Sequence, residues 1–236
     1  MVLLNACLIT FQAKFIQCFI EENRYQYLLK GLGSTLIITF FAVILGVLLG
    51  FLVAIIRSTY DKTGKLRILN FICNIYLTVI RGTPVMVQLL IMYYVIFATT
   101  SMNKTVVAIL SFGINSGAYV AEIVRSGIMS IDQGQFEAGR SLGFSYPLTM
   151  VYIIMPQAFK NVLPALANEF IVLLKETSIC GYIGLMDLTR GGDIIRSVTY
   201  EAFFPLFAVA GIYLCMVMIL TALVKKLERR LRSSER

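Results

Sequence analysis

Four long stretches of this chain contain no charged side chain. They run over Gly31–Ile56, Gly82–Asn103, Thr105–Ala121 and Ala202–Val224. Each approaches or exceeds the roughly 17 to 25 apolar residues that an α-helix needs to cross a bilayer. A water-soluble domain carries about 25% charged residues, whereas this chain has 14% charged and 58% hydrophobic residues. The runs therefore predict an all-α integral membrane protein rather than one or two soluble domains.

A fifth span is predicted between Ser141 and Leu174, although Pro147, Pro156 and Pro164 interrupt the apolar pattern there. The preferred helix runs from about Pro156 to Leu174. A proline in the first helical turn breaks no backbone hydrogen bond, because that N–H has no helical partner in any case. The expected fold is thus a membrane domain with five transmembrane helices.

Positive charge gathers in three segments, which set the expected orientation. These are Arg57–Arg67, Arg125–Pro147 and the tail after Val224. Because cytoplasmic loops carry an excess of Lys and Arg, all three are expected on the cytoplasmic side. With five spans, the N-terminus then lies outside and the C-terminus inside the cell.

The chain divides into three expected segments. Residues 1–30 read as an amphipathic stretch lying in the outer membrane interface, because polar residues break their apolar run. Residues 31–227 form the five-span domain, with a cytoplasmic loop at about 127–150. Residues 228–236 form a basic cytoplasmic tail. The glycine-rich stretch 175–200 is expected outside, as an interfacial or re-entrant piece.

Composition excludes several kinds of chemistry. The chain has no His, which removes Ser-His-Asp and Cys-His nucleophiles and His-ligated metal sites. It has no phosphate-binding loop of the Gly-x-x-x-x-Gly-Lys-Ser/Thr type, so we expect it to bind no ATP by itself. Its net charge of +8 comes without a basic face interleaved with aromatics, so no nucleic-acid partner is expected. We predict no enzymatic activity, metal or cofactor in this chain, and uphill transport would need another subunit or an ion gradient.

Charged side chains inside apolar segments cost about 2.5 to 3.5 kcal/mol on insertion scales, so they indicate function. Glu122 closes a span that is unusually small and polar, with Asn115 and Ser116 at its centre. Lys160 is the complementary cation on the following span. We expect Glu122 to accept an ammonium or guanidinium group of a zwitterionic solute while Lys160 meets its carboxylate. The alternative is a helix-packing seam in which Glu122 pairs with Arg125, one turn along.

Two further classes of function stay open on these residues. An ion-gradient carrier or channel would use Glu122 and Glu169 as proton or cation sites, without any ATPase. A signalling membrane subunit would share a cytoplasmic docking helix but move no solute. Co-purification of an ATPase, and transport by the complete complex, separate these alternatives.

The cytoplasmic loop carries the most specific motif. The sequence GQFEAGRSLGFSYPLTMVYIIMP resembles the loop of permeases from ATP-binding-cassette importers, which reads Glu-Ala-Ala, three residues, Gly, nine residues, Ile, one residue, Leu-Pro. The matching positions are Glu137, Ala138, Gly139, Gly143, Ile153, Met155 and Pro156. Gly139 for Ala and Met155 for Leu are the two departures, and Gly139 should loosen a short helix by up to about 1 kcal/mol.

This motif predicts a short coupling helix that an ATPase subunit grips. Glu137 is expected near the helix start, where a carboxylate complements the dipole. Ala138 and Gly139 are expected to be exposed, and their small side chains would leave a flat helix surface, with Arg140 beside them. Gly143, together with Pro147, is expected to stop the helix.

Further text is similar to the permeases of the polar amino-acid uptake group, namely VIRGTPVMVQL, GAYVAEIVRSGIMSIDQGQFEAGRSLG and MPQAFKNVLPALANEF. The resemblance implies the type I importer architecture, alternating access, and a prokaryotic inner membrane. It implies ATPase subunits that use ATP and Mg²⁺, a second permease subunit with a homodimer favoured, and an extracytoplasmic solute-binding protein. The solute would be a polar, preferably basic, L-amino acid. The expected solute-contacting residues are Gly82, Thr83, Asn115, Ser116, Glu122 and Lys160.

Overall fold

The computed structural model describes residues 10–233, and the elements in that range are helices. The main helices are α2 (Tyr25–Thr63), α3 (Arg67–Gly82), α4 (Val85–Ile91), α5 (Lys104–Met129), α6 (Gln133–Ser141), α7 (Tyr146–Thr149), α8 (Met155–Glu176), α9 (Leu188–Thr199) and α10 (Phe203–Ser233). Short π or 3-10 segments join them: η1 (Ile16–Ile20), η2 (Glu21–Asn23), η3 (Met92–Ile96), η4 (Met150–Ile154) and η5 (Thr177–Ile183).

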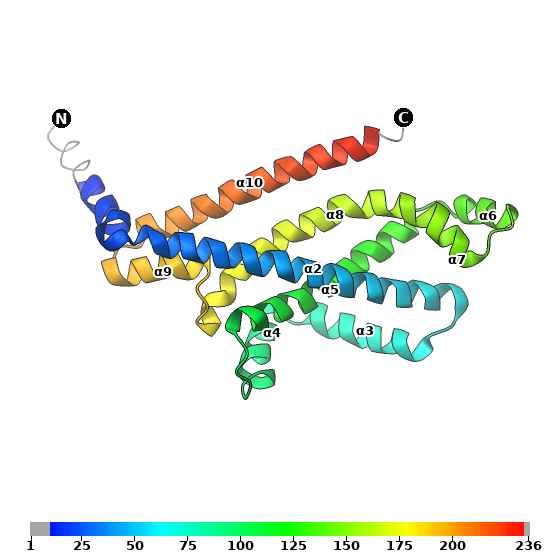
Figure 1. The fold of residues 1–236 in the computed structure, drawn as a ribbon, viewed down its shortest axis with the longest axis horizontal. Coiled ribbons are helices and arrows are strands. Elements are labelled where there is room, and N and C mark those ends of the chain that lie inside the picture. Colours follow the sequence, from blue (N-terminus) through cyan, green and yellow to red (C-terminus); the bar gives the residue numbers. More distant parts are fainter. Residues whose placement is uncertain (1–9, 234–236) are drawn as a thin grey trace.

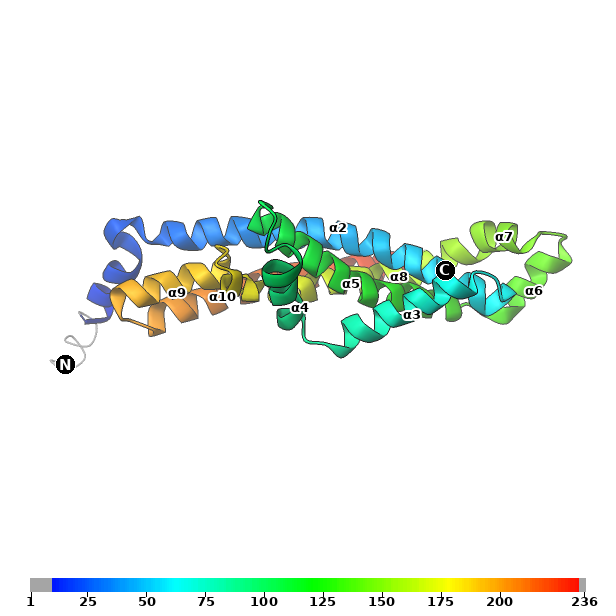
Figure 2. The same ribbon diagram turned by 90° about the horizontal axis from the view of Figure 1, so that it is seen from below.

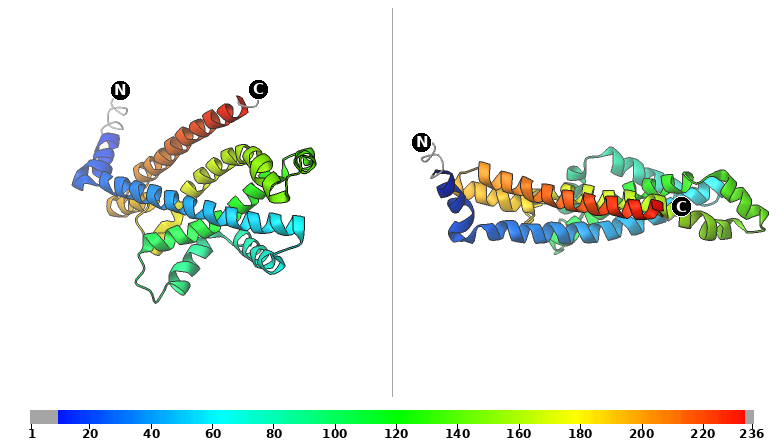
Figure 3. Two further views of the ribbon diagram at one scale, coloured as in Figure 1. Left: turned by 45° about the vertical axis from the view of Figure 1, so that its right-hand side comes forward. Right: turned by 90° about the horizontal axis from the view of Figure 1, so that it is seen from above.

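The molecule is elongated. The N-terminal residues and α9 lie at one end, and α6 and α7 lie at the other (Figure 1). Figure 2 shows that it is also thin, because the long helices run in much the same direction. After α9 the chain turns back, and α10 runs towards the end that carries α6 (Figure 3). The two ends are therefore built from different parts of the chain.

Within the described residues, four helical segments are long and apolar enough to cross a membrane: Tyr25–Asp61, Lys104–Met129, Tyr146–Ile183 and Phe203–Leu231. A fifth candidate is a broken span, formed by α3 and the helix Val85–Ile96 together. The all-helical class is confirmed, and the number of spans is five when the broken pair is taken as one.

The expected second span from Gly82 to Asn103 is wrong in its bounds. The helical pair starts at Arg67, breaks after Gly82 and ends at Ile96, and its two parts are bent by 110°. The break follows from Pro84, which donates no hydrogen bond and disfavours helix at the residue before it. Thr83 is accordingly extended, with φ −122° and ψ 146°. Helix α3 is not evident from the charge pattern, because Arg67 and Arg81 at its two ends leave an uncharged run shorter than a span.

The span predicted between Ser141 and Leu174 starts earlier than expected. Helix begins at Tyr146 rather than at Pro156, and it continues to Ile183. The π-helical turn η4 lies immediately before Pro156 and shifts the hydrogen-bond register where proline has no N–H to offer. The helix Pro156–Leu174 is thus the central part of a longer one.

Helices α2 and α5 form the most extensive helix pair. A Cβ atom added to Gly46 would lie 2.9 Å from the Ser116 side chain, and one on Gly50 would overlap Val120. From the other side, a Cβ on Gly113 would lie 2.6 Å from Leu45. Small residues on both helices therefore let the two backbones approach closely, which places Ser116 at the centre of the contact.

The expected interfacial segment 1–30 falls partly on residues 1–9, which lie outside the described range. From residue 10 to residue 20 the chain is helical, and it then turns at Glu22 and Asn23, whose φ values are 51° and 55°. The guanidinium group of Arg24 lies 3.5 Å from the Glu21 carboxylate and 3.1 Å from that of Glu22. Helix α2 begins at Tyr25.

The glycine-rich stretch after α8 forms η5, a turn at Gly184 and the helix α9. Helix α9 packs against α2 and α10. Its approach to α2 is close, because a Cβ on Gly191 would lie 2.5 Å from the backbone oxygen of Tyr27. A Cβ on Gly31 would overlap the backbone of Asp187. This stretch is therefore a turn followed by a packed helix.

Candidate functional site

A chain of neutral hydrogen bonds joins α5 to the break between α3 and α4. Asn115 is buried on α5, and its Nδ2 donates to Gln88 Oε1 at 2.9 Å. The Nε2 of Gln88 lies 2.7 Å from the Ile80 carbonyl oxygen and 2.8 Å from Thr83 Oγ1. Gly82 and Thr83 are exposed there. The structure thus brings Asn115, Gly82 and Thr83 into one region.

Gln88 was not among the expected site residues. Its signal in the sequence is a single amide in an otherwise apolar run, five residues after Thr83. The bend between α3 and α4 brings this amide to α5, where it contacts Asn115, and the sequence alone does not predict that bend.

A second polar contact joins α5 to α8. The hydroxyl of Ser116, which is fully buried, donates to Glu169 Oε1 at 2.9 Å. Within residues 10–233, no ion pair within 4 Å joins Glu169 to a cation. Glu176 lies seven positions further along α8 and so on about the same face of the helix. Two acidic side chains are therefore available on the α8 face that meets Ser116.

Glu122 is surrounded by arginine. Its carboxylate oxygens lie 3.6 Å from Arg57 on α2, 3.5 Å from Arg81 on α3 and 4.0 Å from Arg125 on α5. Arg125 also lies 3.5 Å from Asp61 on α2. These charges connect α2, α3 and α5, with Arg81 contributed by the last turn of α3. The Glu122–Arg125 pair is thus present, but as the longest of three contacts.

Lys160 does not meet Glu122. Among the described residues, no ion pair within 4 Å is formed by Lys160, which is partly exposed on α8. It lies nine positions before Glu169, which places it on roughly the opposite side of α8 at 3.6 residues per turn. The two expected charges of the zwitterion site are therefore not paired with each other.

Helix α6 carries the coupling motif. Glu137, Ala138 and Arg140 are exposed, as expected for a docking surface. Glu137 is the fifth residue of the helix, so the expectation that it complements the helix start is wrong. That role belongs to Asp132, whose side chain accepts a hydrogen bond of 2.7 Å from the Gly134 N–H.

Gly139 is buried rather than exposed, which corrects a second expectation about α6. A Cβ at this position would lie 2.7 Å from Thr149 Cγ2 and 2.9 Å from Ile153 Cδ1. The missing side chain thus lets α6 rest directly on α7 and η4. Gly143 ends the helix as expected, with φ 84°, and the N–H of Phe144 bonds back to the Gly139 carbonyl at 3.1 Å.

The segment before α9 contains a fully buried carboxyl group. Asp187 caps α9, since its side chain accepts hydrogen bonds from the backbone N–H groups of Thr189 (3.0 Å) and Arg190 (3.3 Å). Burial nevertheless raises the pKa of Asp187 to about 6. On the exposed side of α9, a hydrogen bond from Arg196 lowers the pKa of Asp193 below its usual range. No group of three or more potential metal ligands is found among the residues described.

The amino-acid sequence matches a known family of membrane transport proteins. Residues 46–233 match the family described as binding-protein-dependent transport system inner membrane component. A putative glutamine transport system permease protein from Rickettsia typhi is 40% identical over 207 residues, which cover 87% of this chain and 93% of that protein. An arginine transport system permease protein from Bacillus subtilis is 37% identical, covering 89% of this chain and 94% of the relative.

Solved structures show the same fold. A crystal structure of an amino acid ABC transporter with histidines contains a chain that is 43% identical, with a TM-score of 0.82 over 90% of this chain and 98% of that one. The inward-facing MetNI methionine ABC transporter matches at a TM-score of 0.74, covering 87% of this chain and 96% of that one; at 19% identity this match concerns the fold alone. The resemblance expected from the coupling motif is thus confirmed, and the chain belongs to the family of binding-protein-dependent transport system inner membrane components.

Proposed function

We propose that this chain is the permease subunit of an ATP-driven importer for polar amino acids, with a preference for cationic ones. It would work by alternating access, opening its solute site to one side of the membrane at a time. The family membership supports the class of activity, and the glutamine and arginine permeases among its relatives support the class of solute.

The solute site is placed where α4, α5 and α8 bring their polar groups together. Asn115 and Gln88 offer amide groups, and Gly82 and Thr83 are exposed at the break, where the Thr83 carbonyl accepts a hydrogen bond of 3.0 Å from Gln88 Nε2. The Ser116 hydroxyl donates a hydrogen bond to the Glu169 carboxyl group and so holds it in this region. Amides and exposed backbone suit the α-carboxylate and α-ammonium groups common to all amino acids.

Preference for a cation rests on the two acids of α8. Glu169 has no cationic partner within 4 Å among the described residues, and Glu176 follows two turns later. An intramembrane carboxyl without a partner is expensive, so a guanidinium or ammonium group of the solute is its natural complement. Glu122 already faces three arginines and is proposed to hold the helices in place, whereas Lys160, on the opposite side of α8 from Glu169, is not part of the proposed site.

The ATPase subunit is proposed to grip the exposed face of α6, at Glu137, Ala138 and Arg140. Asp132 caps this helix and makes it a firm lever. Because Gly139 rests on Thr149 and Ile153, a displacement of α6 would push the start of the helix that carries Glu169. This is a direct mechanical route from the motor to the solute site.

The remaining partners follow from the family. We propose a second permease subunit, most simply another copy of this chain, and an extracytoplasmic solute-binding protein in a prokaryotic inner membrane. The α6 end and the basic end of α10 would face the cytoplasm, and the N-terminus would lie outside. Positive charge supports this orientation, since Lys225, Lys226, Arg229 and Arg230 stand at the end of α10.

The hydrogen bond from Ser116 to Glu169 carries the proposal, and uptake assays test it. The complete complex, reconstituted with its ATPase and binding protein, should take up labelled L-arginine and L-glutamine only when ATP is supplied. Replacing Glu169→Gln should weaken L-arginine uptake more than L-glutamine uptake. Asp193→Asn, a neutralised acid on the exposed face of α9, is the matched control. Uptake that persists without ATP and collapses with the ion gradient would instead support a gradient-driven carrier.

A further inference from the structure

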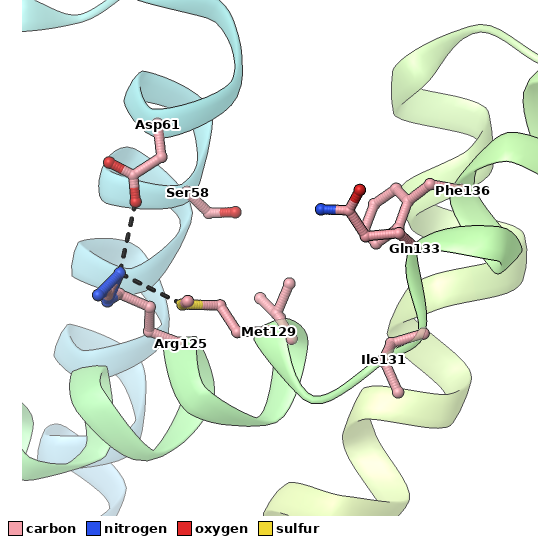
Figure 4. A pocket seen from close by; sticks show the side chains of 8 residues that line it. Ser58, Asp61, Arg125, Met129, Ile131, Gln133 and Phe136 are labelled. Atoms are coloured by element: carbon pink, nitrogen blue, oxygen red, sulfur yellow. Dashed lines mark hydrogen bonds and ion pairs between the residues drawn. The ribbon is translucent and has the colours of Figure 1, made fainter.

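A cavity lies apart from the proposed solute site, at the junction of α2, α5 and α6 (Figure 4). Its volume is about 290 Å³. Arg125 is nine residues beyond Ser116 on α5, which corresponds to about 13 Å along the helix axis. The cavity is therefore a separate place in the fold, situated where the spans meet the coupling helix.

One side of the cavity carries opposite charges. Arg125 Nη1 lies 3.5 Å from Asp61 Oδ2, which is long for a charge-assisted hydrogen bond. The Asp61 side chain is 49% exposed, so it has capacity for another partner. The Arg125 side chain is 25% exposed, and it also contacts Met129 Sδ at 3.4 Å and the Glu122 carboxylate at 4.0 Å. An exposed ion pair of this kind contributes little to stability, and separating it costs correspondingly little.

Ser58 lies on α2 beside Asp61, and Figure 4 shows its hydroxyl facing the amide of Gln133 across the cavity. On the Gln133 side, Ile131 and Phe136 form an apolar wall. The cavity thus has a carboxylate, a guanidinium and a hydroxyl on one side, and a neutral amide with apolar side chains on the other.

A free amino acid matches this arrangement. Its ammonium and carboxylate groups are attached to one carbon atom, and they would meet Asp61 and Arg125 respectively. A volume near 300 Å³ is at the small end of ligand cavities, which suits a solute of about ten heavy atoms. Its aliphatic stem would lie on Ile131 and Phe136, and a polar end group would reach Gln133.

We propose that this cavity binds a free amino acid from the side of the ATPase, and that a bound amino acid slows the transport cycle. The idea rests on the proposed function, because it requires α6 to be the moving coupling helix. The cavity is walled by two spans and by the start of α6, so a ligand that bridges them holds α6 in one position. Such a ligand favours the state in which the cavity has this shape and opposes the state in which it does not.

The test uses the complete complex in proteoliposomes that enclose the solute-loaded binding protein and display the ATPase to the medium. L-arginine or L-glutamine is titrated into the medium through the millimolar range, and ATP hydrolysis is measured. We expect hydrolysis to fall about fivefold or more, the size of a typical coupling between two sites. The variant Asp61→Asn should lose this inhibition and keep its uninhibited rate. Glu228→Gln, which neutralises an acid on α10 away from the cavity, should remain inhibited.

Gln133→Ala provides a second variant, which keeps the test decisive if Asp61→Asn complexes do not assemble. It should shift the inhibition to several-fold higher amino-acid concentration. Inhibition that is absent in the natural chain, or equally strong in both variants, overturns the proposal. Failure of the proposed function looks different, because neither amino acid would then enter the vesicles at all. Normal uptake with no inhibition from the ATPase side refutes only the role of this cavity.

Discussion

The hydroxyl group of Ser116 on α5 donates a 2.9 Å hydrogen bond to the carboxyl group of Glu169 on α8, across 53 positions of the chain. Ser116 lies in the contact between α2 and α5, where Gly46 leaves room for its side chain. The contact therefore orients an acidic group within the helix bundle. Five predictions follow from this and neighbouring contacts.

Ser116→Ala should raise the KM for L-arginine by about tenfold or more, because a hydrogen bond to a charged group is worth about 1.5–3 kcal/mol. Glu169 would lose the donor that holds it in place. Uptake by the reconstituted complex measures the effect. Ser126→Ala is the control, since that hydroxyl bonds only within its own exposed turn. Equal KM values for the two variants would contradict a positioning role for Ser116.

Glu122→Gln should change the KM for L-arginine much less than Glu169→Gln does. The three arginines around Glu122 compete with any solute cation, whereas Glu169 has none within 4 Å among the described residues. We expect the Glu122 variant instead to lower the unfolding temperature by a few degrees, because its helices lose a shared ion pair. A larger KM effect at Glu122 than at Glu169 would move the solute site towards the arginines.

Gly139→Ala should impair coupling even though alanine is the better helix former by about 1 kcal/mol. Its Cβ would lie 2.7 Å from Thr149 Cγ2, and overpacking of this kind costs about 1–3 kcal/mol. The double variant with Thr149→Ser removes that methyl group but keeps the hydroxyl that bonds Ser145. We expect ATP-driven uptake to fall in the single variant and to recover in the double one. Full uptake in Gly139→Ala alone would show that α6 does not rest on α7 as described.

Gly31→Ala should destabilise the fold, whereas Gly33→Ala should not. A methyl group at Gly31 would overlap the backbone of Asp187, and backbone cannot move aside as a side chain can. Nothing lies within 4 Å of the corresponding position at Gly33, so alanine there should gain about 1 kcal/mol of helix propensity. Thermal unfolding of the purified complex distinguishes the pair. Similar melting temperatures for both would mean that α2 and α9 are not packed this closely.

Stability should depend on pH through Asp187. Burial raises its pKa to about 6, so the folded chain holds this proton more tightly than the unfolded chain does. The stabilising contribution is fully present below about pH 4 and is lost as the pH rises through about 6, with a total on the order of 3 kcal/mol. Asp187→Asn should remove this part of the pH dependence between about pH 4 and 6. Unfolding temperatures of the two proteins, measured across that range, should therefore converge at the acidic end and diverge towards neutral pH.

Three of the four uncharged runs lie wholly or mostly in single helices as expected, whereas the run Gly82–Asn103 does not. Helix α2 contains Gly31–Ile56 and α10 contains most of Ala202–Val224. The broken pair around Pro84 escaped prediction because Arg67 and Arg81 enclose an apolar run too short to span a bilayer. Charge counting cannot distinguish such a half-span from a loop.

In the coupling motif, the sequence predicted the position of the helix but not the direction in which each residue faces. Its spacing predicted a short helix ended by Gly143, and α6 ends there. It did not predict which way each residue faces, so Gly139 was expected outside and lies against Thr149. Orientation depends on the helix that α6 packs upon, which is formed by a later part of the chain.

The sequence by itself predicted a membrane protein and a resemblance to binding-protein-dependent permeases. It also predicted the position of the coupling helix. Those properties depend on local composition and on a motif of short range. Only the tertiary structure decided which polar groups meet. Glu122 faces arginines from α2, α3 and α5, and Glu169 faces Ser116, because helix crossing and rotation bring distant positions together. The sequence of a single apolar helix does not specify which other helix it packs against, or which of its faces that contact buries.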